Sequence, residues 1–302
     1  MDLARLSTDA LASFAVFAEH LNFTRSAEEL RISQPALHVK VNKLAESLGR
    51  PLYRRQGRVL TLTREGEVVA RFARELDVRV ATFLAEVRGT APTRPLVLAA
   101  GEGAYLYLLG DLVRDILRGR DDDRRPPLKL INCDRARMLG AVRSGRADLG
   151  VGVLETLPDD LHTTLLASYP ATLVMPADHP LASRRRLTLA DLDGHALVLP
   201  PSSRPHRVAV ERALRDADVD WVLAIEAEGW PLTLHFVSLG VGLAVVNGCV
   251  RPTPGLVARE ITGLPSAPYY AVHLPDRADD PRIDTILTAI QRSLDTDGGE
   301  RR

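Results

Sequence analysis

The chain contains little cysteine, few aromatic residues and no excess of either charge. Among its 302 residues there are two cysteines, Cys133 and Cys249, which are far apart and match no metal-binding spacing. We therefore expect neither a disulfide framework nor a cysteine-ligated metal. Both thiols are expected to be small buried side chains, and the protein is expected in a reducing cytoplasm.

Long hydrophobic runs are also missing. No window approaches the roughly 20 apolar residues that a membrane span needs, and the start of the chain at Met1–Arg5 lacks the charged-then-apolar pattern of a signal peptide. The composition, with 45% hydrophobic and 26% charged residues, is that of a globular protein. A chain of this length has room for roughly two or three domains, and we expect no membrane as a partner.

Sequence patterns of common enzymes are absent as well. The chain has no Ser/His/Asp spacing of nucleophilic catalysis, no glycine-rich phosphate loop and no cluster of metal ligands. The glycines at Gly101 and Gly103 do not complete a dinucleotide fingerprint. We therefore expect no catalytic residue, no cofactor and no metal.

The most informative feature that is present is a helix-turn-helix pattern within residues 24–64. Ser33 is a suitable N-cap for a second helix, because its hydroxyl can accept an orphan N–H. Pro35 is tolerated in the first turn of that helix, and Leu37 and Val41 begin an apolar repeat at helical spacing. Such a motif presents its second helix to the major groove of DNA.

The charge around this motif points to the same partner. Residues 31–64 contain eight Lys and Arg residues and one acid, Glu46, whereas the whole chain has 39 basic and 39 acidic residues. Neutralising phosphates supplies most of non-specific DNA affinity, so we expect this end to contact double-stranded promoter DNA. The alternative is an ordinary solvated basic surface.

Individual side chains can be assigned to that contact. Gln34 can pair with adenine, Lys40 can reach a phosphate, and Arg55 is expected at the groove or backbone beside the motif. The full set of candidate DNA-binding residues is Thr24, Arg25, Ser33, Gln34, Pro35, His38, Lys40, Lys43, Arg54, Arg55 and Arg58.

A hairpin and a long helix follow. Residues 51–62 predict strand, turn and strand, a small wing with arginines at its tip, and Thr63 can cap a helix running to about Arg88. That helix carries a narrow apolar stripe formed by Val69, Phe72, Leu76, Val80, Phe83 and Val87. The stripe favours pairing with a second copy of the chain, and the alternative is packing on its own domain. Residues 89–93 break the helix and mark a linker.

Beyond the linker, strands and helices alternate. A first α/β unit has strands at 96–100, 128–132 and 147–153, with helices from 101 to about 118 and at 135–143. A second unit has strands at 171–175, 196–199, 222–226 and 242–246, with helices near 205–216 and 230–238. A strand at 269–274 and a helix at 280–294 are expected to return to the first unit. Two α/β lobes joined by crossing strands would leave a cleft between them.

We therefore expect an α+β multidomain protein. Residues 1–64 form a winged helix-turn-helix domain, 65–89 a dimerisation helix, and 90–302 a domain of two α/β lobes with a cleft for a ligand. Within the last domain, lobe I takes about 94–167 and 268–302, and lobe II takes about 168–267.

Ligands of open α/β sheets bind at the carboxyl ends of the strands. This rule places the effector cleft between Gly101, Glu102, Gly103 and Asp134 on one lobe and Ser202, Ser203 and Trp230 on the other. Glu102 is unusual, because a helix start normally favours an anionic ligand and here the chain supplies its own carboxylate. The residue either stabilises the helix start or pairs with a cationic or hydroxyl-rich effector.

The assembled pattern resembles the LysR-type transcriptional regulators over nearly the whole chain. The segments that carry the resemblance are Phe23–Leu30, Ile32–Leu37, Leu44–Gly49, Leu52–Arg55, Leu62–Gly66, Gly145–Gly152, Asp178–Leu181 and Val237–Ala244. The resemblance implies a winged helix-turn-helix, a linker-helix dimer and a two-lobed effector domain like a periplasmic binding protein. It further implies assembly as a homodimer or homotetramer, bending of promoter DNA, and a response to a metabolite. RNA polymerase is a further candidate partner.

The chain departs from the family pattern at two positions. Many relatives carry Ser-Arg where this chain has His38-Val39, and valine cannot pair with guanine as arginine does, although it can contact a thymine methyl. Relatives that respond to aromatic carboxylates often carry arginine where this chain has Val153. A simple benzoate-like effector is therefore less expected here.

Two other functions were weighed. A thiol-redox-sensing regulator would use Cys133 and Cys249, which are expected in different lobes and outside an electropositive pocket. A cytoplasmic solute-binding protein without a DNA role would share the two lobes but has no use for residues 1–64. Retention on heparin that falls steeply with salt would favour a regulator over a solute-binding protein.

Overall fold

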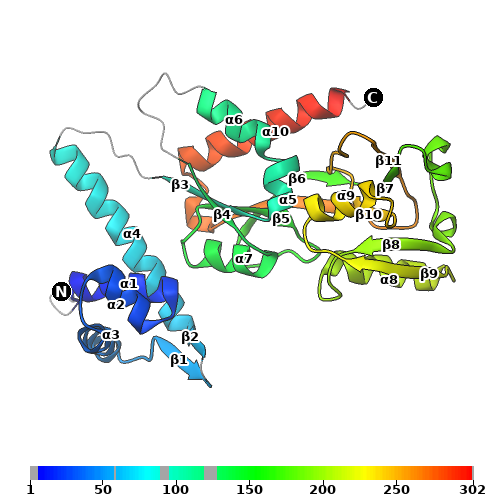
Figure 1. The fold of residues 1–302 in the computed structure, drawn as a ribbon. Coiled ribbons are helices and arrows are strands. Elements are labelled where there is room, and N and C mark those ends of the chain that lie inside the picture. The colour runs from blue at the N-terminus through cyan, green and yellow to red at the C-terminus, as the bar shows by residue number, and fades with distance from the viewer. Residues whose placement is uncertain (1–5, 58, 89–94, 119–127, 301–302) are drawn as a thin grey trace.

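A computed structural model describes residues 6–57, 59–88, 95–118 and 128–300. The helix-turn-helix region lies at one end and the two lobes at the other, with the long helix α4 rising beside the first region (Figure 1). Arg58 and the predicted linker at 89–93 lie outside the described residues. Within the described part of the chain, no helix is both long and apolar enough to cross a membrane.

The N-terminal region contains the predicted helix-turn-helix and wing. Helices α1 (Thr8–His20), α2 (Phe23–Leu30) and α3 (Gln34–Leu48) precede strands β1 (Tyr53–Gln56) and β2 (Val59–Leu62), which pair antiparallel. The predicted cap is confirmed, because the Ser33 hydroxyl accepts the Ala36 N–H at 3.3 Å. Gly49 ends α3 in the left-handed region at a φ of 65°, which glycine adopts without steric cost.

Helix α4 (Arg64–Val87) serves two parts of the molecule. Near its start, Ala70 and Ala73 are buried in the core of the N-terminal region, and Gly66 lies so close to Leu52 that an added Cβ would be 1.8 Å from the Leu52 carbonyl oxygen. Farther along, Phe83 is 60% exposed and Val87 is 68% exposed. The predicted apolar stripe is therefore divided, with one part packed on its own domain and the other open.

Lobe I is built on a five-stranded sheet in the order β4-β3-β5-β12-β6. Strands β3 (Leu96–Ala100), β4 (Leu128–Asn132) and β5 (Leu149–Val153) are parallel. Strand β12 (Ala267–His273) runs antiparallel between β5 and β6 (His162–Tyr169). The prediction that the C-terminal segment returns to the first unit is confirmed by β12, and the chain crosses between lobes near Tyr169 and Ala267.

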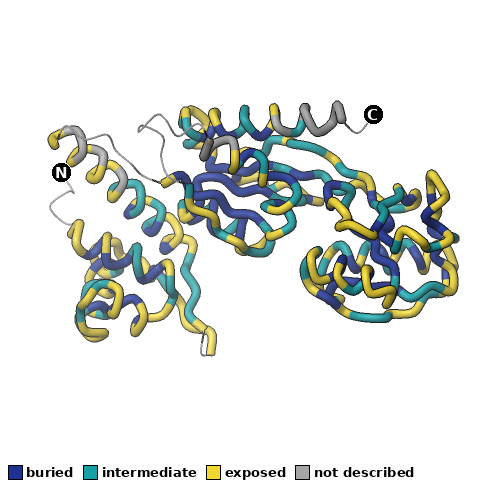
Figure 2. Tube along the Cα trace, turned by 45° about the horizontal axis from the view of Figure 1, so that its top comes forward, coloured by how far each residue is buried: buried dark blue, intermediate teal, exposed yellow. Residues whose placement is uncertain are grey.

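Both faces of this sheet are covered, which explains why every residue of β3 is buried. Alternate residues of β3 belong to two cores. Leu96, Leu98 and Ala100 share a core with helices α6 (Gly110–Arg118) and α10 (Pro281–Glu300), whereas Val97 and Ala99 pack with α7 (Arg135–Arg143). Figure 1 shows α6 and α10 above the sheet and α7 below it, and Figure 2 shows the buried strands between them.

Lobe II contains two smaller sheets. Strands β10 (Ala244–Asn247), β7 (Ala171–Pro176) and β11 (Leu256–Glu260) form an antiparallel sheet, and β8 (His195–Leu199) pairs parallel with β9 (Trp221–Glu226). A bridge between Leu197 and Leu243 joins the two. Helices α8 (Pro205–Asp216) and α9 (Trp230–Ser238) follow β8 and β9, while 3₁₀ turns occupy Pro180–Ser183, Leu189–Leu192 and, after β12, Pro275–Arg277.

Two predictions about lobes I and II were incomplete. The single helix expected from 101 to about 118 is two, α5 (Glu102–Tyr107) and α6, separated at Leu108 and Leu109. Both leucines are buried, and their backbone N–H groups both donate to the Ala104 carbonyl, which ends α5 before α6 begins. Strands β6 and β11 were not predicted, because their partly exposed positions give no clear apolar run.

Candidate functional site

The second helix of the motif presents the predicted contact residues at its start. Gln34 opens α3 and is exposed, and the Thr24 hydroxyl of α2 donates to Gln34 Oε1 at 3.4 Å. Arg25 is exposed beside Thr24, and its backbone N–H is capped by the Asn22 side chain at 3.1 Å. Ser33, Pro35 and Lys43 are exposed as well. The beginnings of α2 and α3 thus form one polar surface.

Two predicted contact residues have partners inside the chain. The imidazole of His38 is half-buried and stacks on Phe23, with ring centroids 3.6 Å apart. Lys40 Nζ lies 2.7 Å from the Asp9 carboxylate of α1. Both contacts hold these side chains against the motif, so contact with DNA would have to compete with them.

The wing carries two exposed arginines. Arg54 Nε donates to the Thr61 hydroxyl at 3.3 Å, and Arg55 Nε donates to the Gly57 carbonyl at 2.9 Å. Within the described residues, neither these side chains nor Arg25 and Lys43 form an ion pair with an acid. Their positive charges are therefore not neutralised within the chain and are available to phosphates.

The cleft between the lobes is a cavity of about 1280 Å³. Six of the seven predicted effector residues line it, namely Gly101, Glu102, Gly103, Asp134, Ser203 and Trp230. Ser202 does not line it; this residue lies in the turn that precedes α8, one position before Ser203. The strand-end rule therefore located the cavity but misplaced one side chain.

The lobes approach each other closely at Glu102 and Gly103. A Cβ at Gly103 would lie 2.7 Å from Trp230 Cδ1, and a Cβ at Gly229 would lie 2.9 Å from Glu102 Oε2. Glycine at both positions lets α5 of lobe I meet the start of α9 in lobe II. The Glu102 carboxylate consequently lies beside Gly229 and the Trp230 residue that follows it.

Several cavity residues were not among the predicted effector contacts, and the position of His206 at a helix start favours a solvated residue over a ligand on the sequence alone. His206 donates from Nε2 to the Val245 carbonyl at 2.8 Å and meets Trp230 edge-on, with ring centroids 5.1 Å apart. Burial lowers the pKa of His206, so its imidazole is neutral at neutral pH. Asn247 donates to the Tyr269 hydroxyl at 3.1 Å, and burial raises the pKa of that phenol. No local pattern marks these side chains, because their partners are distant in sequence.

The charged side chains of the cavity are arranged in pairs. Every arginine among the described lining residues lies within 4 Å of a carboxylate that also lines the cavity. The pairs are Arg135 with Glu155 at 3.7 Å, Arg137 with Asp134 at 3.7 Å, Arg212 with Asp216 at 3.6 Å, and Arg204 with Glu228. Glu102 has no such partner in the described part of the chain.

The cysteines do not form the pair that a thiol switch would use. Cys133 lines the cavity and Cys249 is buried, and neither forms a disulfide. The pKa of Cys133 is raised, by burial first and by the neighbouring Asp134 second. A raised pKa reduces the thiolate fraction on which redox reactivity depends, so the structure does not favour the thiol-sensing alternative.

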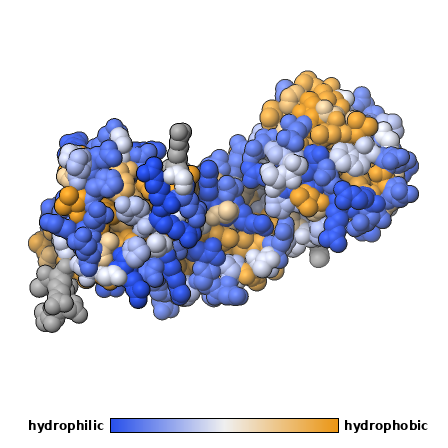
Figure 3. Space-filling model, turned by 90° about the horizontal axis from the view of Figure 1, so that it is seen from below, coloured by the Kyte–Doolittle hydropathy of each residue, from blue (hydrophilic) through white to orange (hydrophobic). Residues whose placement is uncertain are grey.

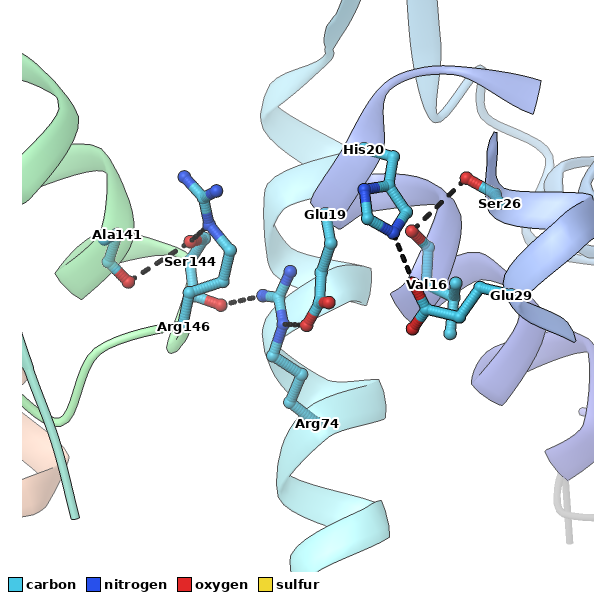
Figure 4. A network of polar contacts seen from close by, with 9 residues as sticks. All are labelled: Val16, Glu19, His20, Ser26, Glu29, Arg74, Ala141, Ser144 and Arg146. Atoms are coloured by element: carbon cyan, nitrogen blue, oxygen red, sulfur yellow. Dashed lines mark hydrogen bonds and ion pairs between the residues drawn. The ribbon is translucent and has the colours of Figure 1, made fainter. Parts of the chain in front are cut away.

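A polar contact connects the N-terminal region to lobe I. Arg74 of α4 donates from Nη1 to the carbonyl of Ser144, which caps the end of α7, and its Nε lies 3.8 Å from Glu19 of α1. Figure 4 shows the Arg74 guanidinium between Glu19 and Ser144. Burial lowers the pKa of Arg74 to about 10, and Glu19 opposes that shift, so the side chain stays charged at neutral pH.

Beside this contact, Glu19, His20 and Glu29 form the one group among the described residues whose side-chain geometry could suit a metal ion. His20 Nε2 already lies 2.5 Å from Glu29 Oε2, and Glu19 faces the Arg74 guanidinium. A cation bound there would be repelled by Arg74. These side chains are therefore explained by their contacts with one another, and we assign no metal to them.

Two segments of the chain match models of known protein families. Residues 8–67 match the model of the bacterial regulatory helix-turn-helix proteins of the lysR family, and residues 89–295 match the LysR substrate binding domain. The transcriptional regulator CatR of Pseudomonas putida is 29% identical over 304 residues, covering 94% of this chain and 98% of that protein. The Hca operon transcriptional activator HcaR of Escherichia coli is 27% identical and covers 94% and 97%.

Solved structures show the same fold. A full-length OxyR variant from Pseudomonas aeruginosa superimposes with a TM-score of 0.69 at 21% identity, covering 95% of each chain. HinK of Pseudomonas aeruginosa, a LysR family transcriptional regulator, gives a TM-score of 0.59 at 17% identity and covers 95% and 98%. The chain belongs to the LysR family. It is a DNA-binding transcriptional regulator with an effector-binding domain.

Proposed function

We propose that this regulator binds promoter DNA through the starts of α2 and α3 and through the wing, and that a small metabolite in the interlobe cavity controls this binding. The observation that carries the proposal is the position of α7. Its N-cap, Asp134, lines the cavity, and its C-cap, Ser144, holds Arg74 of α4. A helix of nine residues, about 13 Å long, thus connects the cavity to the DNA-binding region.

Base recognition is assigned to Gln34, and phosphate binding to Arg25, Lys43, Arg54 and Arg55. Replacing Gln34 by alanine removes a side chain that can pair with adenine at two atoms, which is worth roughly 1–3 kcal/mol of discrimination. Gln34→Ala should therefore lower the ratio of specific to random DNA affinity, measured by fluorescence anisotropy on duplexes recovered from the native genome. Gln291→Ala, the same change on α10, is the matched control. An unchanged ratio in Gln34→Ala would contradict base recognition.

The cavity is assigned to the effector, with Glu102, Asp134, Ser203 and Trp230 as candidate contacts. A ligand there can change DNA binding only through different affinities for the two states of the protein. Ser203→Trp should obstruct the part of the cavity beside Trp230 and remove ligand-induced thermal stabilisation while DNA affinity stays unchanged. If a stabilising metabolite still acts on Ser203→Trp, the effector binds elsewhere.

Self-assembly is assigned to two apolar surfaces. The exposed half of the α4 stripe, with Phe72, Val80 and Phe83, would pair with α4 of a second copy. Lobe II offers another surface on the edge strand β9, where Val222 is 62% exposed. Figure 3 shows hydrophobic atoms gathered at the lobe II end of the molecule. One surface gives a homodimer, and both together give a homotetramer.

Two further assignments follow from regulation of transcription. The protein would act in the cytoplasm, where promoter DNA is accessible in a bacterial cell. RNA polymerase would be its partner wherever it activates a promoter. Co-precipitation of RNA polymerase with the protein on a bound promoter fragment, compared with the fragment alone, tests the second assignment.

A further inference from the structure

Among the described residues, Glu102 is the charged group of the cavity that lacks an oppositely charged partner. Each lining arginine has its own carboxylate, as described above, and His206 is neutral at neutral pH because burial lowers its pKa. Glu102 remains without a cationic partner among the described residues. An anionic ligand would therefore have to share an arginine with an existing carboxylate, whereas a cationic ligand would find in Glu102 a carboxylate with no cationic partner among the described residues.

The surroundings of Glu102 also suit a cation. The Glu102 carboxylate lies against Gly229, and the indole of Trp230 lies against Gly103, so a carboxylate and a large aromatic ring border the same part of the cavity. Aromatic faces attract ammonium and guanidinium groups, with tryptophan the strongest. Beyond this corner, Val153 adds an apolar side chain to the lining and no cation.

The negative charge of Glu102 also acts on its neighbours. The pKa of Tyr107 on α5 is raised, by burial first and by the Glu102 charge second. Glu102 is exposed to the cavity rather than withdrawn into the protein. Its charge is therefore accessible to a ligand that enters from solvent.

We propose that the effector of this regulator is a small molecule that carries a protonated amine or a related cation, held by Glu102 with its apolar part against Trp230. This inference rests on the proposed function of the cavity and specifies the chemistry of its ligand. The alternative is that the Glu102 carboxylate only stabilises the start of α5.

Trp230 allows the charge preference to be measured without knowing the effector. The chain has two tryptophans, so Trp221→Phe leaves Trp230 as the single source of indole fluorescence. Caesium and iodide quench this fluorescence with opposite charges, and neutral acrylamide corrects for accessibility. In full-length Trp221→Phe protein, the caesium-to-iodide quenching ratio of Trp230 should exceed the ratio measured for free N-acetyltryptophanamide. Adding Glu102→Gln should lower caesium quenching by about fivefold, as expected for one unit charge at about 4 Å in water, and the caesium-to-iodide ratio should fall with it.

The matched control is Glu260→Gln, which removes the same charge from the exposed edge of β11, outside the cavity. It should leave the quenching ratio unchanged. A ratio that does not respond to Glu102→Gln, or that responds equally to Glu260→Gln, would overturn the proposal and leave Glu102 as a helix-start residue.

Ligand pairs with the same number of carbon atoms and opposite charge then test binding itself. The probes are benzylamine with benzoate and putrescine with succinate, titrated into the Trp221→Phe protein and followed by Trp230 emission. Each amine should bind about tenfold more tightly than its carboxylate partner, which corresponds to roughly 1.4 kcal/mol. Glu102→Gln should remove this preference. Ser203→Trp adds a second indole to the cavity, so its binding is followed by thermal stabilisation, which should be abolished.

The remaining outcomes separate the two proposals. Tighter binding of benzoate or succinate that Ser203→Trp abolishes would overturn the cationic effector while supporting the cavity as the effector site. Binding of either probe that Ser203→Trp leaves intact would overturn the cavity assignment as well. No Trp230 response to any of the four probes at millimolar concentration would overturn both.

Discussion

On the DNA-binding surface, Arg25, Lys43 and Arg55 have no acidic partner among the described residues, whereas every arginine described in the cavity wall has one. The first surface keeps a net charge and suits a polyanion, because each uncompensated cation adds to phosphate affinity. The cavity cancels its charges except at Glu102, and so suits a small ligand recognised by the position of one group. Affinity is distributed over many side chains in the first site and concentrated on few in the second.

The N-terminal region is also packed more tightly at one point than the effector domain is at its helix α7. Gly66→Ala should therefore destabilise the protein more than any other substitution considered below. A Cβ at Gly66 would lie 1.8 Å from the Leu52 carbonyl oxygen, so α4 and the start of the wing would have to separate. We expect a loss of about 3 kcal/mol or more, measured by chemical denaturation, and loss of DNA binding.

Gly140→Ala is the control for that substitution. It lies within α7, where an added Cβ meets nothing within 4 Å. An alanine there should stabilise lobe I by about 0.5–1 kcal/mol. Equal destabilisation by the two substitutions would show that the close approach at Leu52 does not matter.

Assembly should depend on the open half of α4, not on the half that packs on the N-terminal core. Leu76 belongs to the packed half, so Phe83→Asp is the cleaner test. A buried, unpaired carboxylate is strongly unfavourable, so sedimentation should show smaller species and affinity for paired half-sites should fall about tenfold or more. Ala81→Asp, on the opposite side of the helix, should keep the native mass. A native mass for Phe83→Asp would place the dimer interface elsewhere.

A smaller effect is expected from pH, and only in the effector domain. Because burial lowers the pKa of His206 below its unfolded value near 6.5, the unfolded state binds a proton that the folded state resists. Stability should therefore fall as the pH drops below about 6.5, by up to about 1.4 kcal/mol per pH unit. His206→Asn should reduce this slope in denaturation curves at pH 7.5 and 5.5. The exposed His235→Asn should retain the wild-type slope, and equal slopes for both variants would contradict the assignment.

The difference between the DNA-binding region and the cavity also explains which features could be predicted from the sequence. The helix-turn-helix is local, so Ser33, Gly49 and the apolar repeat of α3 specify its start, end and inner face. Cavity residues at strand ends, such as Gly101 and Asp134, could also be predicted, because parallel strands bring their carboxyl ends to one edge of the sheet.

Contacts between residues that are distant in sequence could not be predicted from local patterns. Arg74 and Ser144 are 70 positions apart, and the contact between His206 and Val245 spans 39. Lys40 and His38 were expected to face DNA, and the partners that hold them, Asp9 and Phe23, belong to other helices. Periodicity and capping signals describe single elements, whereas these contacts depend on how elements pack.

The central claim is that the cavity and the DNA-binding region are coupled through Arg74. Coupling between two sites is reciprocal, so DNA must change the cavity if a cavity ligand changes DNA binding. The direct measurement is Trp230 emission and caesium quenching in the Trp221→Phe protein during titration with a duplex recovered from the native genome. We predict a change that saturates with DNA binding and that Arg74→Ala abolishes while DNA affinity stays within about threefold. A DNA-dependent change that persists in Arg74→Ala, or no change in the parent protein, would contradict the account.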